Sequence, residues 1–143
     1  MLLVDTNIVT HLLINGERTR AAQDLCKSDP DWRSESFLLV EFTNVLTAYV
    51  AKKRMTLTSA RRALTKATAL LDGKLARTDH SIVLALAAEY RVSANDARFL
   101  ALANQLGKRL VTEDAKLRAA APALTQSLAE ALAGTVNRTD MAL

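Results

Sequence analysis

The sequence predicts one α/β domain in which helices pack on both sides of a short, mostly parallel central sheet, a three-layer α/β/α arrangement. Two observations predict it. Short apolar runs alternate with longer segments whose apolar residues recur every three or four positions, which is the pattern of parallel strands joined by crossover helices. The chain has 143 residues, 50% of them hydrophobic, with only four glycines and two prolines, and this favours a single helix-rich domain.

In the first half of the chain, apolar periodicity and turn residues define five elements. The run Leu2 to Val4 is a buried strand that ends at polar residues. Pro30 ends the second helix because the residue before a proline avoids helical geometry. Apolar residues occur all round the helix at 36–53, so we expect it to be buried on every side. The expected elements are a strand at 2–4, helices at 8–14 and 17–27, a weakly indicated strand at 32–34, and the helix at 36–53.

The second half continues the alternation. Apolar residues repeat at helical spacing from Leu57 to Leu71, and Gly73 follows where a glycine commonly ends a helix. Ser127 and Glu130 match a capping box that opens the last helix. The further expected elements are strands at 74–77, 110–112 and 123–126, and helices at 79–90, at 96–106, from 113 and from 127. We expect the domain to span residues 1–134, followed by a flexible tail at 135–143.

Composition excludes several classes of protein. Cys26 is the only cysteine, which excludes an intramolecular disulfide and a cysteine-based zinc site. The N-terminus has no signal-peptide pattern and no apolar run approaches the roughly 18 residues of a membrane span, so we expect a cytoplasmic protein that does not contact membranes. The net charge of +4 favours polyanionic partners, although a merely soluble surface explains it equally well.

The usual short catalytic motifs are absent. Neither phosphate-loop signature occurs, and the two histidines, His11 and His80, lack the spacing of a zinc protease or a convincing role in a nucleophile triad. His11 lies within an apolar stretch, which favours a structural role. The chemistry of this chain must therefore come from other side chains.

Four acidic residues are the strongest candidates. Asp5 and Asp114 follow the first and fourth expected strands, at the edge where parallel sheets bind ligands. Glu41 lies within an apolar helix, and Asp96 opens another helix. Each has a structural alternative: Asp5, Asp96 and Asp114 have the positions of helix caps or first-turn acids, and Glu41 could form a buried salt bridge with an arginine.

A cation would allow four converging carboxylates to stay ionised together. Two carboxylates about 4 Å apart repel by roughly 4 kcal/mol at an effective dielectric constant of 20. Ligation by oxygen alone suits Mg²⁺ or Mn²⁺, which also bind substrate phosphates. An acidic metal site within a basic protein is the combination that a phosphodiester-cleaving enzyme needs.

Four segments resemble, in order, the four motifs of PIN domains. They are LLVDTN at the N-terminus, LLVEFTNVL around Glu41, SANDARFLALANQLG around Asp96 and LVTED around Asp114. Their order and spacing are similar to those of VapC-type toxin ribonucleases in particular. The resemblance extends from Leu2 to about Ala133, so it covers nearly the whole chain.

The resemblance implies an endoribonuclease that depends on Mg²⁺ or Mn²⁺, prefers single-stranded RNA and leaves a 5′-phosphate and a 3′-hydroxyl. It implies that Asp5, Glu41, Asp96 and Asp114 are the catalytic and metal-binding acids. It also marks three residues that support these acids, namely Thr6, Asn7 and Thr112. It further implies a homodimer and a cognate antitoxin protein, as in a VapBC-type toxin–antitoxin pair.

Three alternatives remain beside this interpretation. A housekeeping RNA-processing PIN nuclease would carry the same acids. A non-catalytic PIN module that binds RNA or protein typically loses acids, and none of the four is lost here. Phosphatases of the haloacid dehalogenase type also place an aspartate after the first strand, but they need a second aspartate where this chain has Asn7.

Overall fold

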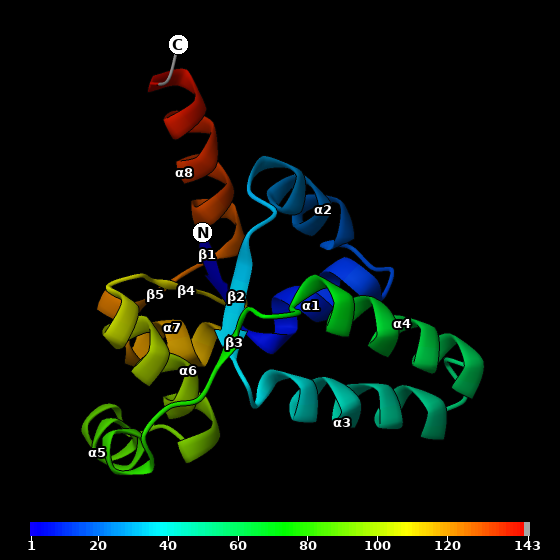
Figure 1. The fold of residues 1–143 in the computed structure, drawn as a ribbon, viewed down its shortest axis with the longest axis horizontal. Coiled ribbons are helices and arrows are strands. Elements are labelled where there is room, and N and C mark those ends of the chain that lie inside the picture. Colours follow the sequence, from blue (N-terminus) through cyan, green and yellow to red (C-terminus); the bar gives the residue numbers. More distant parts are fainter. Residues whose placement is uncertain (142–143) are drawn as a thin grey trace.

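The computed structural model describes the backbone of residues 1–141 and the side chains of residues 1–135. Its elements alternate as expected (Figure 1). In chain order they are β1 (Leu2–Val4), α1 (Thr6–Leu13), α2 (Thr19–Ser28), β2 (Trp32–Glu35), α3 (Leu38–Ala51), α4 (Leu57–Leu70), β3 (Leu75–Ala76), α5 (His80–Tyr90), α6 (Ala94–Leu106), β4 (Leu110–Val111), α7 (Ala115–Ala120), the 3-10 turn η1 (Pro122–Leu124), β5 (Thr125–Gln126) and α8 (Leu128–Met141).

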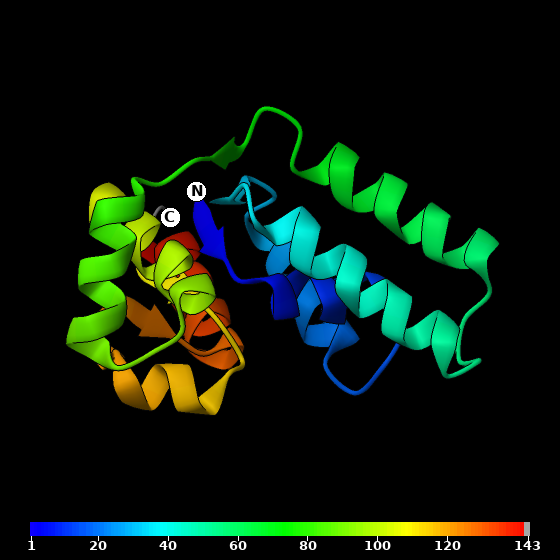
Figure 2. The same ribbon diagram turned by 90° about the horizontal axis from the view of Figure 1, so that it is seen from below.

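The five strands form one parallel sheet in the order β3-β2-β1-β4-β5. The chain moves outward from β1 to β3 and then returns to place β4 on the other side of β1. Helices α1 to α4 lie on one side of the sheet and α5 to α7 on the other (Figures 1 and 2), which confirms the three-layer prediction. The reversal of direction between β1 and β4 creates the kind of crevice in which open parallel sheets bind ligands.

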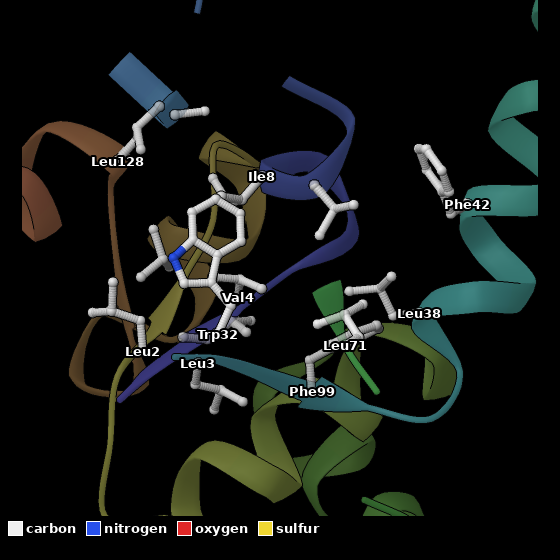
Figure 3. Packing of buried hydrophobic residues seen from close by; sticks show 14 of the residues in the cluster. Leu2, Leu3, Val4, Ile8, Trp32, Leu38, Phe42, Leu71, Phe99 and Leu128 are labelled. Atoms are coloured by element: carbon white, nitrogen blue, oxygen red, sulfur yellow. The ribbon is translucent and has the colours of Figure 1, made fainter. Parts of the chain in front are cut away.

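The core lies around β1, whose three residues are all buried. Trp32 of β2, Phe42 of α3 and Phe99 of α6 are its largest fully buried side chains, and they reach it from different elements (Figure 3). Burial of a side chain of this size stabilises a fold by about 1.5–3 kcal/mol. This packing fixes the positions of the β1 and β4 ends and of the first turns of α3 and α6.

The prediction that the third helix is buried on every side is wrong. Leu38, Phe42 and Leu46 form one buried face of α3, whereas Val40 is 52% exposed. The α3–α4 hairpin projects beyond the sheet (Figure 2), so α3 packs against α1 and α4 along one side. Val40 therefore faces solvent, while Leu39 and Val50 are partly buried against the core.

The last helix, α8, runs to the end of the described backbone. Residues 135–141, expected to begin a tail, continue helix α8, and residues 142–143 lie outside the described part of the chain. The domain boundary at residue 134 stays a prediction. Within the described residues, no helix is long and apolar enough to cross a membrane.

Candidate active site

The four predicted acids line one cavity at the carboxyl edge of the sheet. Asp5 directly follows β1 and Asp114 lies three residues after β4, while Glu41 and Asp96 stand in the first turns of α3 and α6. The cavity has a volume of about 410 Å³. Its lining consists of Asp5, Thr6, Asn7, Thr10, Glu41, Asn44, Val45, Asp96 and Asp114. Four segments that are distant in sequence thus bring their carboxylates to one place.

Asp5 is buried and accepts three hydrogen bonds. It is 6% exposed, and its Oδ1 accepts a hydrogen bond of 2.7 Å from the Thr6 backbone N–H at the start of α1. Its Oδ2 accepts from Thr112 Oγ1 at 2.8 Å and from Asn7 Nδ2 at 3.3 Å. The three residues expected to support the acids, Thr6, Asn7 and Thr112, all lie within hydrogen-bonding distance of a site carboxylate.

Burial raises the pKa of Asp5 to about 7. Loss of hydration is the largest cause, because a charged carboxylate is poorly solvated inside the protein. The negative charges of Glu41 and Asp96 raise this pKa further, whereas the hydrogen bonds from Thr112 and Thr6 lower it. Asp5 therefore carries a proton at a pH where most aspartates are ionised.

Glu41 is also held by a threonine. Its Oε1 accepts a hydrogen bond of 2.7 Å from Thr6 Oγ1, and partial burial raises its pKa, with a further contribution from the charges of Asp96 and Glu35. No ion pair joins Glu41 to a cation among the side chains at residues 1–135. The salt bridge considered as a structural role for Glu41 is therefore not present there.

Asp96 and Asp114 have the capping positions that the sequence indicates and also face the cavity. Ser93 caps α6 by accepting a hydrogen bond from the Asp96 N–H at 3.1 Å. Asp114 caps α7, with its Oδ1 accepting from the N–H groups of Lys116 at 3.0 Å and Leu117 at 3.1 Å. Burial raises the pKa of Asp96, and the charge of Asp114 adds to it. The Asp114 side chain therefore both caps a helix and lines the cavity, whereas at Asp96 it is the backbone N–H that takes part in the cap.

Thr112 connects the two loops that carry Asp5 and Asp114. Besides donating to Asp5, its Oγ1 accepts hydrogen bonds from Asn7 Nδ2 at 3.0 Å and from the Asp114 N–H at 3.1 Å. The Asn7 Oδ1 in turn accepts from the Glu113 N–H at 3.0 Å. This network fixes the β1 and β4 ends relative to each other, as a binding site on two strands requires.

The donor set fits a hard divalent cation. The site offers oxygen ligands, and among the described side chains no lysine or arginine lines the cavity, so its negative charges are left for a metal to balance. Within the described residues, no group of three or more acidic, histidine or cysteine side chains is arranged so that it could hold a metal ion together. Mg²⁺ is commonly held by one or two carboxylates while it keeps several waters and binds a substrate phosphate, which an open cavity allows.

Two polar residues of the cavity were not predicted. Thr10 lies one helical turn after Thr6 on α1, and Asn44 lies three residues after Glu41 on α3, and both line the cavity. Their helical spacing from predicted site residues is the signal that could have found them. In the sequence alone, such residues are indistinguishable from the solvated face of a helix.

A family model for the PIN domain matches residues 2–122, which is most of the chain. The chain belongs to the PIN domain family. PIN domains are generally metal-dependent nucleases, and the acidic cavity lies within the matched residues.

Among solved structures, this PIN domain is similar to the crystal structure of PAE2754 from Pyrobaculum aerophilum. The TM-score is 0.73 and the identity 21%, with 95% of this chain and 96% of the other covered. At this identity the likeness shows the fold alone. No curated protein sequence matches the chain.

Proposed function

We propose that this PIN domain is an endoribonuclease that cleaves single-stranded RNA with the help of Mg²⁺ or Mn²⁺. Asp5, Glu41, Asp96 and Asp114 would hold the metal. The observation that carries the proposal is the convergence of these four acids on one cavity, which no basic side chain of residues 1–135 lines. The resemblance of the four motifs to those of VapC-type toxins supports RNA as the substrate.

In this proposal, water attacks phosphorus, the bond from phosphorus to the 3′-oxygen breaks, and that oxygen leaves as a 3′-hydroxyl after taking up a proton. A bound divalent ion supplies activation of water near neutral pH and balances negative charge on the phosphate. Thr6, Asn7 and Thr112 keep the carboxylates in place by the hydrogen bonds described above. Pre-positioned ligands of this kind lower the cost of reaching the reactive geometry.

We further propose that the enzyme is the toxin of a VapBC-type pair, a cytoplasmic homodimer held inactive by a cognate antitoxin. The order and spacing of the four motifs support this role. Expression of the chain alone in a bacterial host should then arrest growth, and the Glu41→Gln variant should not. Normal growth with active wild-type enzyme would favour a housekeeping nuclease instead.

Metal dependence is the direct test of the nuclease. The purified protein should cleave labelled single-stranded RNA in Mn²⁺ or Mg²⁺ and stop in EDTA, because the clustered carboxylates are ionised together only around a cation. Analysis of product ends by gel should give 5′-phosphates. Activity undiminished by exhaustive chelation would overturn the metal mechanism, and RNA binding without any cleavage would indicate a non-catalytic module.

A further inference from the structure

A second cavity adjoins the acidic one and differs from it in charge. It has a volume of about 560 Å³ and lies where β2 and β3 end. Its lining consists of Glu35, Ser36, Phe37, Val40, Arg77, Thr78, His80 and Arg98. The proposed nuclease chemistry uses none of these side chains.

Residues of the same two helices line both cavities. On α3, Val40 lines this second cavity and Glu41 lines the acidic one. On α6, Arg98 lines the second cavity and Asp96 the acidic one. Glu35 of the second cavity is also close enough to Glu41 for its charge to raise the pKa of Glu41. The two cavities therefore lie near each other, and a polymer with one phosphodiester among the acids can extend into the second cavity.

Glu35, the acidic residue of the second cavity, already has hydrogen-bond and ion-pair partners within the protein. Glu35 is 1% exposed, and its Oε1 accepts hydrogen bonds from Ser36 Oγ at 2.8 Å and the Phe37 N–H at 2.9 Å. Its Oε2 accepts from Thr78 Oγ1 at 3.3 Å and forms an ion pair with Arg98 at 3.8 Å. Glu35 thus offsets one arginine and leaves the charge of Arg77 unbalanced within the lining.

Arg98 is held in a fixed position on this wall. Its guanidinium carbon lies 5.2 Å from the centre of the Phe37 ring, an arrangement that favours a cation over an aromatic face. Its Nε is buried and has no hydrogen-bond partner among the described residues. A planar guanidinium pre-positioned in this way is suited to phosphate oxygens.

The same cavity offers apolar surface for a base. Val40 is 52% exposed although it is an aliphatic residue, and Phe37 lies one helical turn before it at the start of α3. Aromatic and aliphatic surface beside arginines is the combination with which proteins hold single-stranded nucleic acid, because bases stack and phosphates pair with the cations.

We propose that this second cavity binds the nucleotide next to the cleaved phosphodiester of single-stranded RNA. Its phosphate contacts Arg77 and Arg98, and its base packs on Phe37 and Val40. The inference rests on the proposed nuclease function, because that function places the cleaved phosphodiester of the RNA in the acidic cavity. The nuclease function does not depend on it.

The test measures binding of a labelled single-stranded RNA oligonucleotide in EDTA, where cleavage is absent, by fluorescence anisotropy. Arg77→Gln should weaken binding roughly tenfold and reduce the slope of log affinity against log salt by about 0.7, the value for one lost phosphate contact on a single strand. The matched control is Arg62→Gln, which removes the same charge from an exposed position on α4 and should change affinity by less than about twofold.

A second pair of variants tests the apolar wall without disturbing the core. Val40→Glu places a negative charge in the cavity, and Thr43→Glu places the same charge on the same helix at an exposed position outside it. Val40→Glu should weaken RNA binding at least tenfold more than Thr43→Glu. The proposed nucleotide site would be overturned if each variant and its control weakened RNA binding equally, or if the wild type did not bind the RNA.

The outcomes for the two proposals are separable. Selective loss of binding in Arg77→Gln and Val40→Glu supports the nucleotide site even if the wild type fails to cleave RNA in Mn²⁺, which would overturn only the nuclease. Cleavage by the wild type combined with equal effects of each variant and its control overturns only the nucleotide site.

Discussion

Glu35 and Glu41 stand six positions apart in the sequence, yet their surroundings differ. Glu35 is buried and pairs with Arg98 while accepting three hydrogen bonds. Glu41 is half-buried and has a threonine hydroxyl as its partner, with other acids nearby. Removing a buried acid that pairs with a cation leaves that cation unpaired and destabilises the fold, whereas an acid among like charges costs stability unless a metal binds. This contrast predicts opposite effects of the same substitution.

Glu41→Gln should melt no lower than the wild type in EDTA, because it removes like-charge repulsion and its amide oxygen still accepts from Thr6. It should lose cleavage in Mn²⁺ by about 100-fold or more. Asp96→Asn should behave in the same way. The matched control, Glu35→Gln, should lower the melting temperature because it leaves Arg98 without its ion-pair partner. A large drop in melting temperature for Glu41→Gln with activity retained would contradict the site role.

The raised pKa of Asp5, about 7, predicts how stability depends on pH without metal. The folded protein binds a proton at Asp5 more tightly than the unfolded chain, whose aspartate has a pKa near 3.8. The resulting stabilisation is fully present below pH 4 and is lost as the pH rises through 7. Urea unfolding in EDTA should therefore show this part of the stability falling between about pH 4 and 7, and Asp5→Asn should remove that dependence. An unchanged pH dependence in Asp5→Asn would show that other groups cause it.

At the scale of elements, all four acids of the cavity lie at helix N-termini. Asp5 caps α1 and Asp114 caps α7, while Glu41 and Asp96 lie in the first turns of α3 and α6. The structural explanation that the sequence offered for Asp5 and Asp114 as helix caps is present in the fold, and their role in metal binding stays a proposal. A helix N-terminus favours a nearby negative charge. Where helices begin just after strands end, carboxylates at those N-termini therefore lie at the carboxyl edge of the sheet.

This double role can be separated at Asp114. Asp114→Asn keeps an oxygen that can cap α7 and should retain the stability of the wild type, whereas Asp114→Ala should lose about 1 kcal/mol of unfolding free energy along with the cap. Both should lose most cleavage because both remove the charge. Urea unfolding of the two variants beside the RNA assay checks this. Full activity in Asp114→Asn would leave Asp114 with capping as its only role.

Local signals in the sequence were sufficient for the order of elements, the parallel sheet and the location of the four acids at one edge. These features follow from periodicity, caps and the alternation of strands with helices. The features that were missed depend on tertiary neighbours. The exposure of Val40 follows from the projection of the α3–α4 hairpin, and the pairing of Glu35 with Arg98 joins β2 to α6. A single sequence carries no local signal for either.

At the scale of the whole molecule, the acidic cavity and the rest of the chain carry net charges of opposite sign. Nineteen basic residues face fifteen acidic ones, so without the four acids of the cavity eleven acids remain and the rest of the chain carries +8. An acidic cavity repels a phosphate chain when no metal is bound, and basic residues elsewhere in the chain attract it. RNA affinity must therefore come from contacts outside the acidic cavity, and it must depend on salt.

The affinity for single-stranded RNA should fall linearly with salt on logarithmic axes, with a slope of about −0.7 for each phosphate contacted. Adding Ca²⁺ or Mn²⁺ to a cleavage-deficient variant such as Asp96→Asn should raise the affinity but leave most of this slope, because the contacts of the basic residues lie outside the acidic cavity. Titrations by fluorescence anisotropy from low to physiological ionic strength measure both quantities. A flat salt dependence would mean that lysine and arginine contacts contribute little, and RNA would then be held mainly by its bases.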